Sequence, residues 1–101
     1  MRRAKVLLHW LVTGQLDVSP RGSHFSLPAR FDHQGDDWMD NAWSLVVDLD
    51  GSPDSHRNQV GTVGFLMPEA PNDWLREGKR FILMEGPLAL AEGEITQVRT
   101  D

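Results

Sequence analysis

The fold is decided by the stretch Phe81-Ile82-Leu83-Met84-Glu85-Gly86-Pro87-Leu88-Ala89-Leu90. It predicts a β-hairpin, because two runs of strand-forming residues flank a tight turn at Glu85-Gly86-Pro87. Gly86 has no Cβ and is free to take a positive φ in such a turn. Apolar side chains from both runs can then pair across the hairpin and fill one core.

The rest of the chain follows the same pattern. Its 9 glycines divide it into short apolar runs and leave little room for a helix of normal length. Strands are predicted at residues 6–12, 24–31, 43–49, 60–67, 81–84 and 88–98. The only helical signal is a turn at residues 72–78, which Gly78 would end. We therefore expect an all-β fold: a small six-stranded, antiparallel, Greek-key-like barrel with one short helical turn.

A barrel is favoured over an open sandwich, because a small open sheet leaves strand edges exposed to aggregation. Two strands carry further signals. Pro28 lacks an N–H and predicts that strand 24–31 is an edge or bulged strand. Strand 6–12 is apolar on both faces, so we expect it to be covered on both sides, with His9 packed inside the protein. Gly93 is expected to kink the last strand.

Composition restricts the class of protein. At 101 residues the chain holds one core, so residues 1–101 are expected to be a single domain. The absence of cysteine excludes disulfides, thiolate metal sites and thiol nucleophiles. A net charge of −5 argues against a generic nucleic-acid binder. No apolar run approaches the ~18 residues of a membrane span, and we expect a cytoplasmic protein without a membrane partner.

The last third of the chain resembles a known family. Arg80-Phe81-Ile82-Leu83-Met84-Glu85-Gly86, followed by Ala91-Glu92-Gly93-Glu94-Ile95, is similar to the β-barrel third domain of bacterial elongation factor Tu. The last hairpin of that family reads roughly Gly-x-Arg-Phe-x-x-Arg-Glu-Gly, then Gly-x-Gly-x-Val/Ile after a short gap. The matching residues are Arg80, Phe81, Glu85, Gly86, Gly93 and Ile95, whereas Met84 replaces an Arg and Ala91 a Gly.

The resemblance implies a standalone barrel of this type. The chain has no GTPase domain, no P-loop and no second barrel, and residues 27–31 do not reproduce the family's Gly-Tyr-Arg-Pro element. Translation activity does not follow from the fold. In the family, this barrel contacts the transfer-RNA stem and partner domains, so the resemblance allows RNA as a partner.

No constellation of residues predicts catalysis. The acidic loop 48–54 departs from the calcium-loop consensus, with Gly51 fourth and Pro53 sixth. The acidic segment 36–40 has His33 nearby but no further ligand pattern. Both loops are expected to be solvated, without metal. The sequence contains no nucleophile-elbow motif, and its histidines have no recognisable triad partners. We expect no enzyme activity and no cofactor.

The distribution of basic residues and the positions of the tryptophans allow two functions. Residues 1–35 hold five basic and two acidic side chains, so Arg21 and Arg30 could join Arg2, Arg3 and Lys5 in a patch that faces RNA phosphates, or serve only solubility.

Trp38, Trp43 and Trp74 lie near loop–strand junctions, where they either bind a partner or cover a barrel end. The primary hypothesis is a non-catalytic module that binds an unidentified protein, and the alternative is an RNA-associated accessory.

Overall fold

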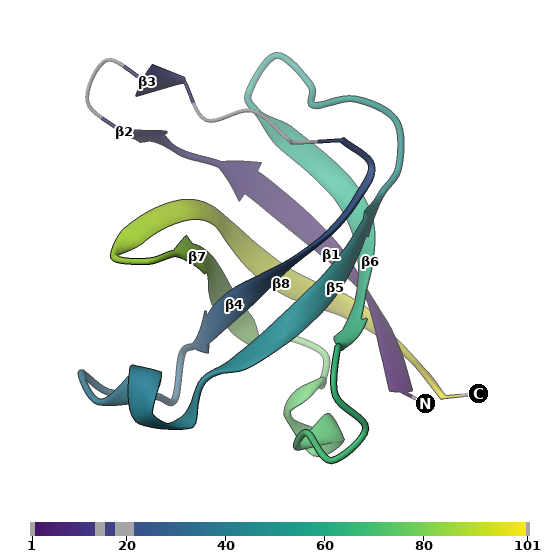
Figure 1. The fold of residues 1–101 in the computed structure, drawn as a ribbon. Helices are drawn as coiled ribbons and strands as arrows, with labels where there is room; N and C mark the ends of the chain where they lie inside the picture. The colour runs from purple at the N-terminus through teal and green to yellow at the C-terminus, as the bar shows by residue number, and fades with distance from the viewer. Residues whose placement is uncertain (1, 14–15, 18–21, 101) are drawn as a thin grey trace.

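The protein is a closed antiparallel β-barrel (Figure 1). The computed structural model describes residues 2–13, 16–17 and 22–100. The barrel strands are β1 (Arg2–Trp10), β4 (His24–Phe31), β5 (Trp43–Leu49), β6 (Asn58–Phe65), β7 (Arg80–Glu85) and β8 (Leu88–Thr100). They close in the order β1-β6-β5-β4-β7-β8, which confirms the predicted fold class.

Short elements complete the described part of the chain. The strands β2 (Val12–Thr13) and β3 (Leu16–Asp17) form a small separate sheet. Two 3-10 turns, η1 (Trp38–Asn41) and η2 (Asn72–Trp74), follow β4 and β6. η2 lies inside the predicted helical turn 72–78 but ends at Trp74 rather than at Gly78, which takes a φ of 83° in a separate turn. The turn η1 was not predicted. No helix in the described residues is long and apolar enough to cross a membrane.

Pro28 predicted that β4 is an edge or bulged strand. Closure gives each barrel strand two neighbours, so β4 is not an edge strand, and its pairings with β5 and β7 show no register shift. Pro28 lies opposite Ser44 of β5, and the ladder between β4 and β7 begins only at Ala29. The missing N–H of proline therefore falls just outside the β4–β7 ladder, where it interrupts no pairing with that strand.

Side chains alternate between the core and the outer wall along β1. Ala4, Val6, Leu8 and Trp10 are buried, while Leu7 and His9 are exposed. The expectation that this strand is covered on both sides, with His9 packed, is wrong. The barrel has only one interior, and every second residue of a barrel strand faces outward. His9 instead lies on the wall, with its Nδ1 3.1 Å from Oδ1 of Asn58.

The core is built around aromatic rings. Phe31 lies 5.8 Å from Phe65 and 5.7 Å from Phe81, measured between ring centroids. Phe81 is in register with Gly93, and its ring occupies the space that a side chain at Gly93 would fill. Gly93 therefore makes room for a core aromatic ring. The register irregularities of β8 lie near Leu90 and Thr96 rather than at Gly93.

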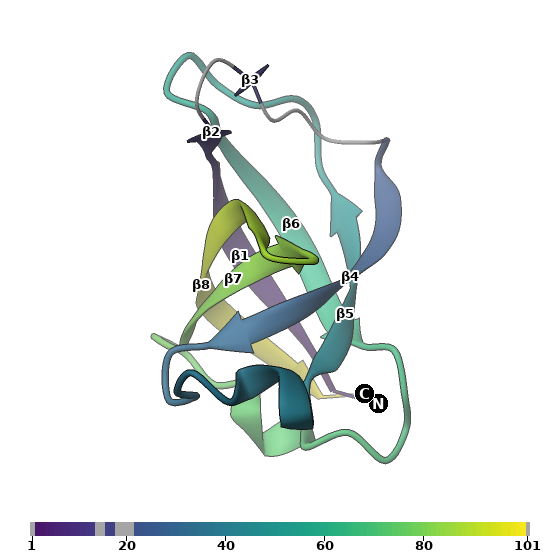
Figure 2. The same ribbon diagram turned by 60° about the vertical axis from the view of Figure 1, so that its left-hand side comes forward.

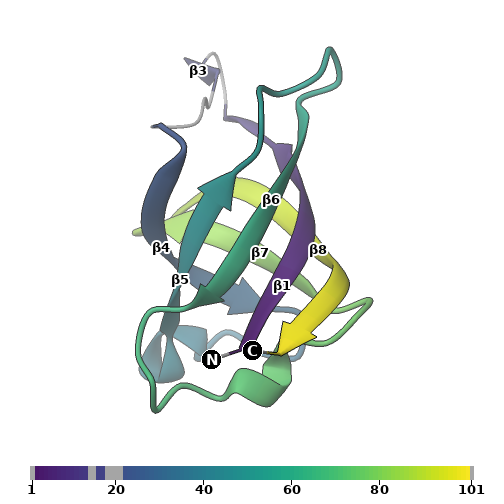
Figure 3. The ribbon, with the colours of Figure 1, turned by 90° about the vertical axis from the view of Figure 1, so that its right-hand side faces the viewer.

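The hairpin between β7 and β8 forms as predicted. Glu85 pairs with Leu88, and Gly86 takes a φ of 57° in the turn between them. Leu83 and Leu90 are buried in the core. Strand β8 continues past the hairpin to pair with β1, which closes the barrel (Figure 3).

Candidate functional site

Both 3-10 turns lie at the same end of the barrel (Figure 2). We call the surface formed by residues 32–43 and 66–79 the capped end. The ring of Trp74 joins its two segments, because it packs edge-on against Phe31 at 5.4 Å and against His33 at 4.3 Å. The surface carries seven carboxylates and two cationic side chains, so it is strongly acidic.

Three of the four tryptophans belong to the capped end. Trp38 is buried at 8% exposure, and Trp43 and Trp74 are half-buried against the core. Trp38 and Trp74 line the same pocket, whereas Trp43 begins β5 and pairs with Ala29. These rings therefore cover the barrel end, and two of them also border an opening in it.

The pocket has a volume of about 250 Å³. Its lining consists of two indoles, an imidazole, two carboxylates, two amide side chains and a glycine: Trp38, Trp74, His33, Asp37, Asp40, Gln34, Asn41 and Gly35. Within the part of the chain that is described, neither Asp37 nor Asp40 has a basic side chain within ion-pair distance. The opening is therefore aromatic and negatively charged.

Three exposed apolar side chains also lie at the capped end. The large hydrophobic residues that are exposed in the described chain are Leu7, Met39, Val60, Leu66 and Met67. Met39 is 67% exposed on η1, and Leu66 and Met67 follow β6 at the same end. The remaining two face each other on the wall, where Leu7 pairs with Val60. The backbone N–H of Leu66 donates to the carbonyl of Ser44, which ties its loop to the start of β5.

Asp32 anchors the capped end to the barrel wall. Its carboxylate accepts a charged contact from Lys79 Nζ at 3.0 Å and the backbone N–H of Arg80 at 3.3 Å. Desolvation by burial acts to raise the pKa of Asp32, but the hydrogen bonds to Lys79 and Arg80 outweigh it and hold the pKa below its ordinary value. This carboxylate is therefore ionised at neutral pH, and its contacts with Lys79 and Arg80 already compensate its charge.

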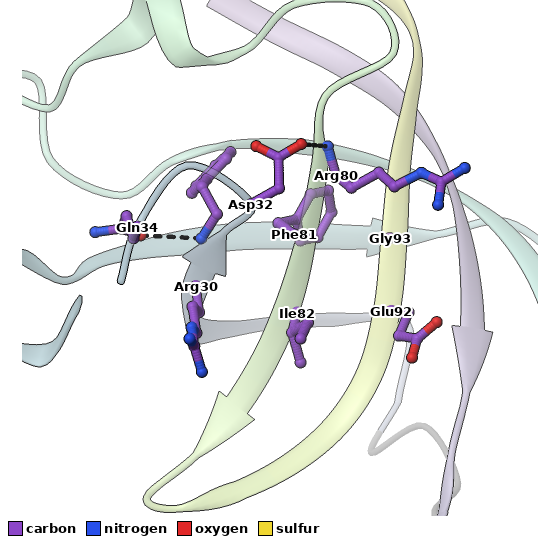
Figure 4. Close-up of a pocket in the computed structure, with 9 residues that line it drawn as sticks. Arg30, Asp32, Gln34, Arg80, Phe81, Ile82, Glu92 and Gly93 are labelled. Carbon is purple, nitrogen blue, oxygen red and sulfur yellow. Dashed lines mark hydrogen bonds between the residues drawn. The ribbon is translucent and has the colours of Figure 1, made fainter. Parts of the chain in front are cut away.

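A second pocket, of about 370 Å³, opens on the wall beside the capped end (Figure 4). Arg30, Ile82 and Glu92 are in register across β4, β7 and β8, and Figure 4 shows the arginine and the glutamate on either side of Ile82. Gln34 lines both pockets. Its side chain accepts the N–H of Phe31 at 2.9 Å and donates to the carbonyl of Asn41 at 3.2 Å, which fixes the turn between the pockets.

The predicted basic patch is not assembled in the described structure. Arg30 lies on β4, while Arg2, Arg3 and Lys5 lie on β1, which is three strands away in either direction around the barrel. Arg21 lies outside the described residues. Arg3 is instead in register with Arg99 of β8. Sequence reasoning missed Arg99, because the pairing of the first strand with the last cannot be read from local pattern.

The acidic segment 48–54, which begins with the last two residues of β5, lies at the opposite end of the barrel (Figure 1). Asp54 accepts the backbone N–H groups of His56 at 2.8 Å and Asn58 at 2.9 Å, and the bond from Asn58 contributes most to lowering the pKa of Asp54. Asp48 is hydrogen-bonded to His24 on the neighbouring strand. Among the residues described, no three His, Asp or Glu side chains are grouped so as to hold a metal ion.

Comparison with protein-family models, with curated proteins and with solved structures finds no match to this chain.

Proposed function

We propose that this barrel is a non-catalytic, cytoplasmic protein-interaction module that binds its partner through the capped end. The observation that carries the proposal is the exposure of Met39, Leu66 and Met67 at the capped end, which is acidic and contains Trp38 and Trp74. Methionine adapts its shape to apolar partners, and tryptophan is enriched at the centres of interfaces. Exposed apolar groups rimmed by charge are typical of a docking surface.

The test compares two apolar sites of the same protein. Met39→Ser with Met67→Ser removes two exposed side chains from the capped end, and Leu7→Ser with Val60→Ser removes two from the wall. Partners captured from the native cell are identified, purified and titrated against each variant. We expect the methionine variant to bind about tenfold more weakly and the wall variant to bind as the unchanged protein does. Equal affinity of both variants would refute the proposal.

The second candidate, an RNA-associated accessory, is favoured by one observation. Arg3 and Arg99 are opposite each other on adjacent strands, although like charges in this position destabilise a sheet. A phosphate backbone would neutralise the pair. The resemblance to the third domain of elongation factor Tu supports the same candidate, because that barrel contacts a transfer-RNA stem, and we propose this kinship together with the RNA role.

A salt titration tests the second candidate. Binding to a structured RNA should weaken steeply as salt rises, because phosphate contacts release counterions. The double variant with Arg3→Gln and Arg99→Gln should bind RNA with a weaker dependence on salt concentration. The decrease in slope should correspond to the loss of about two phosphate contacts. Arg76→Gln at the capped end serves as the charge control. Absence of RNA binding at low salt would eliminate this function.

A further inference from the structure

We propose that the pocket between Trp38 and Trp74 takes up a cationic side chain, specifically an arginine, from the partner protein. The inference rests on the proposed function and names the chemistry that the partner must present. It depends on three properties of the pocket, which are its aromatic walls, its uncompensated carboxylates and its size.

Aromatic walls attract cations through the negative face of the ring, and tryptophan is the strongest of the aromatic side chains in this respect. Two indoles line this opening. Trp74 is held in place by edge contacts with Phe31, His33 and Phe65, at centroid distances of 5.4, 4.3 and 6.4 Å. Because these contacts order the ring before a ligand arrives, little conformational freedom is left to lose on binding.

Two carboxylates supply the charge. Asp37 and Asp40 line the pocket, and no Lys or Arg side chain lies among its lining residues. The neighbouring carboxylates differ, because Asp32 is paired with Lys79, and Asp36 lies 3.9 Å from Arg30. The pocket therefore presents a negative potential that no described cation on the chain compensates. A cation held between these carboxylates and the indoles is attracted by both.

The size of the pocket selects a side chain over a larger ligand. A volume of about 250 Å³ lies below the ~300–1,000 Å³ of sites for drug-sized molecules. A metal ion is disfavoured because the described residues offer no group of three His, Asp or Glu ligands. Arginine fits better than lysine, since its planar guanidinium stacks on aromatic faces and can donate to two carboxylates at once.

The probe for this proposal is N-acetyl-arginine amide, and its neutral isostere N-acetyl-citrulline amide is the control ligand. The indole N–H signals of Trp38 and Trp74 report binding in NMR titrations of the whole protein. We expect the arginine probe to shift both signals with a Kd on the order of millimolar, as befits a single side chain. The citrulline probe should leave them in place. Equal shifts with both probes would refute the proposal.

Charge variants give an independent check. Asp37→Asn with Asp40→Asn should weaken binding of the arginine probe about fivefold to tenfold, because both exposed carboxylates lose their charge. Glu69→Gln with Glu77→Gln removes the same charge from the capped end outside the pocket and should change the Kd less than twofold. Equal effects of the two pairs would mean that only the general field of this surface acts on the probe, and would overturn the proposed site.

The outcomes separate this inference from the proposed function. If partner binding depends on Met39 and Met67 but the arginine probe shifts neither indole signal, the cation pocket is refuted and the docking function stands. If the methionine variant binds the partner normally, the docking function is refuted whatever the probe does. If both tests succeed, replacement of each arginine of the partner by glutamine should identify the one that enters the pocket.

Discussion

At the scale of the residue, the packing of the core requires a glycine at position 93, where no side chain can be accommodated. A Cβ added there would lie 2.6 Å from Cε2 and 2.8 Å from Cε1 of Phe81. Phe81 is buried and packed against Phe31, so its ring cannot move aside freely. We predict that Gly93→Ala lowers the free energy of unfolding by about 1–3 kcal/mol or more, measured by urea denaturation.

Gly35→Ala is the matched control, because a Cβ there meets only Oδ1 of Asp37, at 3.5 Å. It should change stability by less than about 0.5 kcal/mol. Phe81→Leu combined with Gly93→Ala should cost less than the sum of the two single changes, since the smaller side chain relieves the clash. Additive losses would show that the ring is not the cause.

The carboxylate of Asp32 predicts a dependence of stability on pH. Its pKa is lowered in the folded protein from an ordinary value of 3.8, so its charge stabilises the fold above that value. The contribution is lost as the pH falls through the folded pKa. Asp32→Asn keeps an acceptor for the N–H of Arg80 but loses the charged contact with Lys79. The side chain is 47% exposed, so the loss should stay below about 1 kcal/mol.

Urea midpoints of the unchanged protein and of Asp32→Asn, compared at several pH values, measure this effect. The difference should be constant from about pH 7 to pH 5 and should shrink as the pH falls below the ordinary value of 3.8 and through the lowered pKa of the folded state. A difference that persists unchanged into strong acid would contradict the assignment of the effect to the charge of Asp32.

At the scale of the element, a buried side-chain pair joins β1 to β6. Trp10 Nε1 donates to Gln59 Oε1 at 3.0 Å, and Gln59 Nε2 donates to the carbonyl of Gly51 at 2.9 Å. Gln59→Leu leaves the indole N–H and this carbonyl without their partner. We predict a loss of about 1–3 kcal/mol in the free energy of unfolding. Gln97→Leu, on the exposed wall of β8, should be nearly neutral, and equal losses for both variants would contradict the role of the pair.

Elements governed by local pattern could be predicted from the sequence. The hairpin of β7 and β8 follows from its alternation and from Gly86, and the bounds of β4 and β5 match those predicted. The turn η1 could not be predicted, because its sequence, Trp38-Met39-Asp40-Asn41, has no helical periodicity. Trp38, the first residue of η1, is buried at the end of the barrel. This burial depends on residues that are distant in the sequence.

At the scale of the whole molecule, closure of the barrel explains which parts of the candidate site were foreseeable. Trp38 and Trp74 could be selected by composition and position, but their approach to one pocket depends on β4 and β6 ending at the same end of the barrel. The separation of Arg30 from Arg3 depends equally on strand order. Neither relation can be predicted from a local stretch of sequence. The basic patch was predicted from proximity in the sequence alone, and the strand order keeps its members apart.

Closure also predicts that the protein unfolds as one unit. The barrel has a common core, to which Trp10 contributes from β1 and against which Trp43 and Trp74 pack from the capped end. Loss of any barrel strand opens this core, so the whole should unfold cooperatively. We predict that the four indole N–H signals of the native protein lose intensity at a single urea midpoint in NMR spectra. An earlier midpoint for Trp38 and Trp74 would show that the capped end unfolds independently. In that case the pocket between them would be lost by local unfolding of the capped end, at a lower free energy than the unfolding of the barrel.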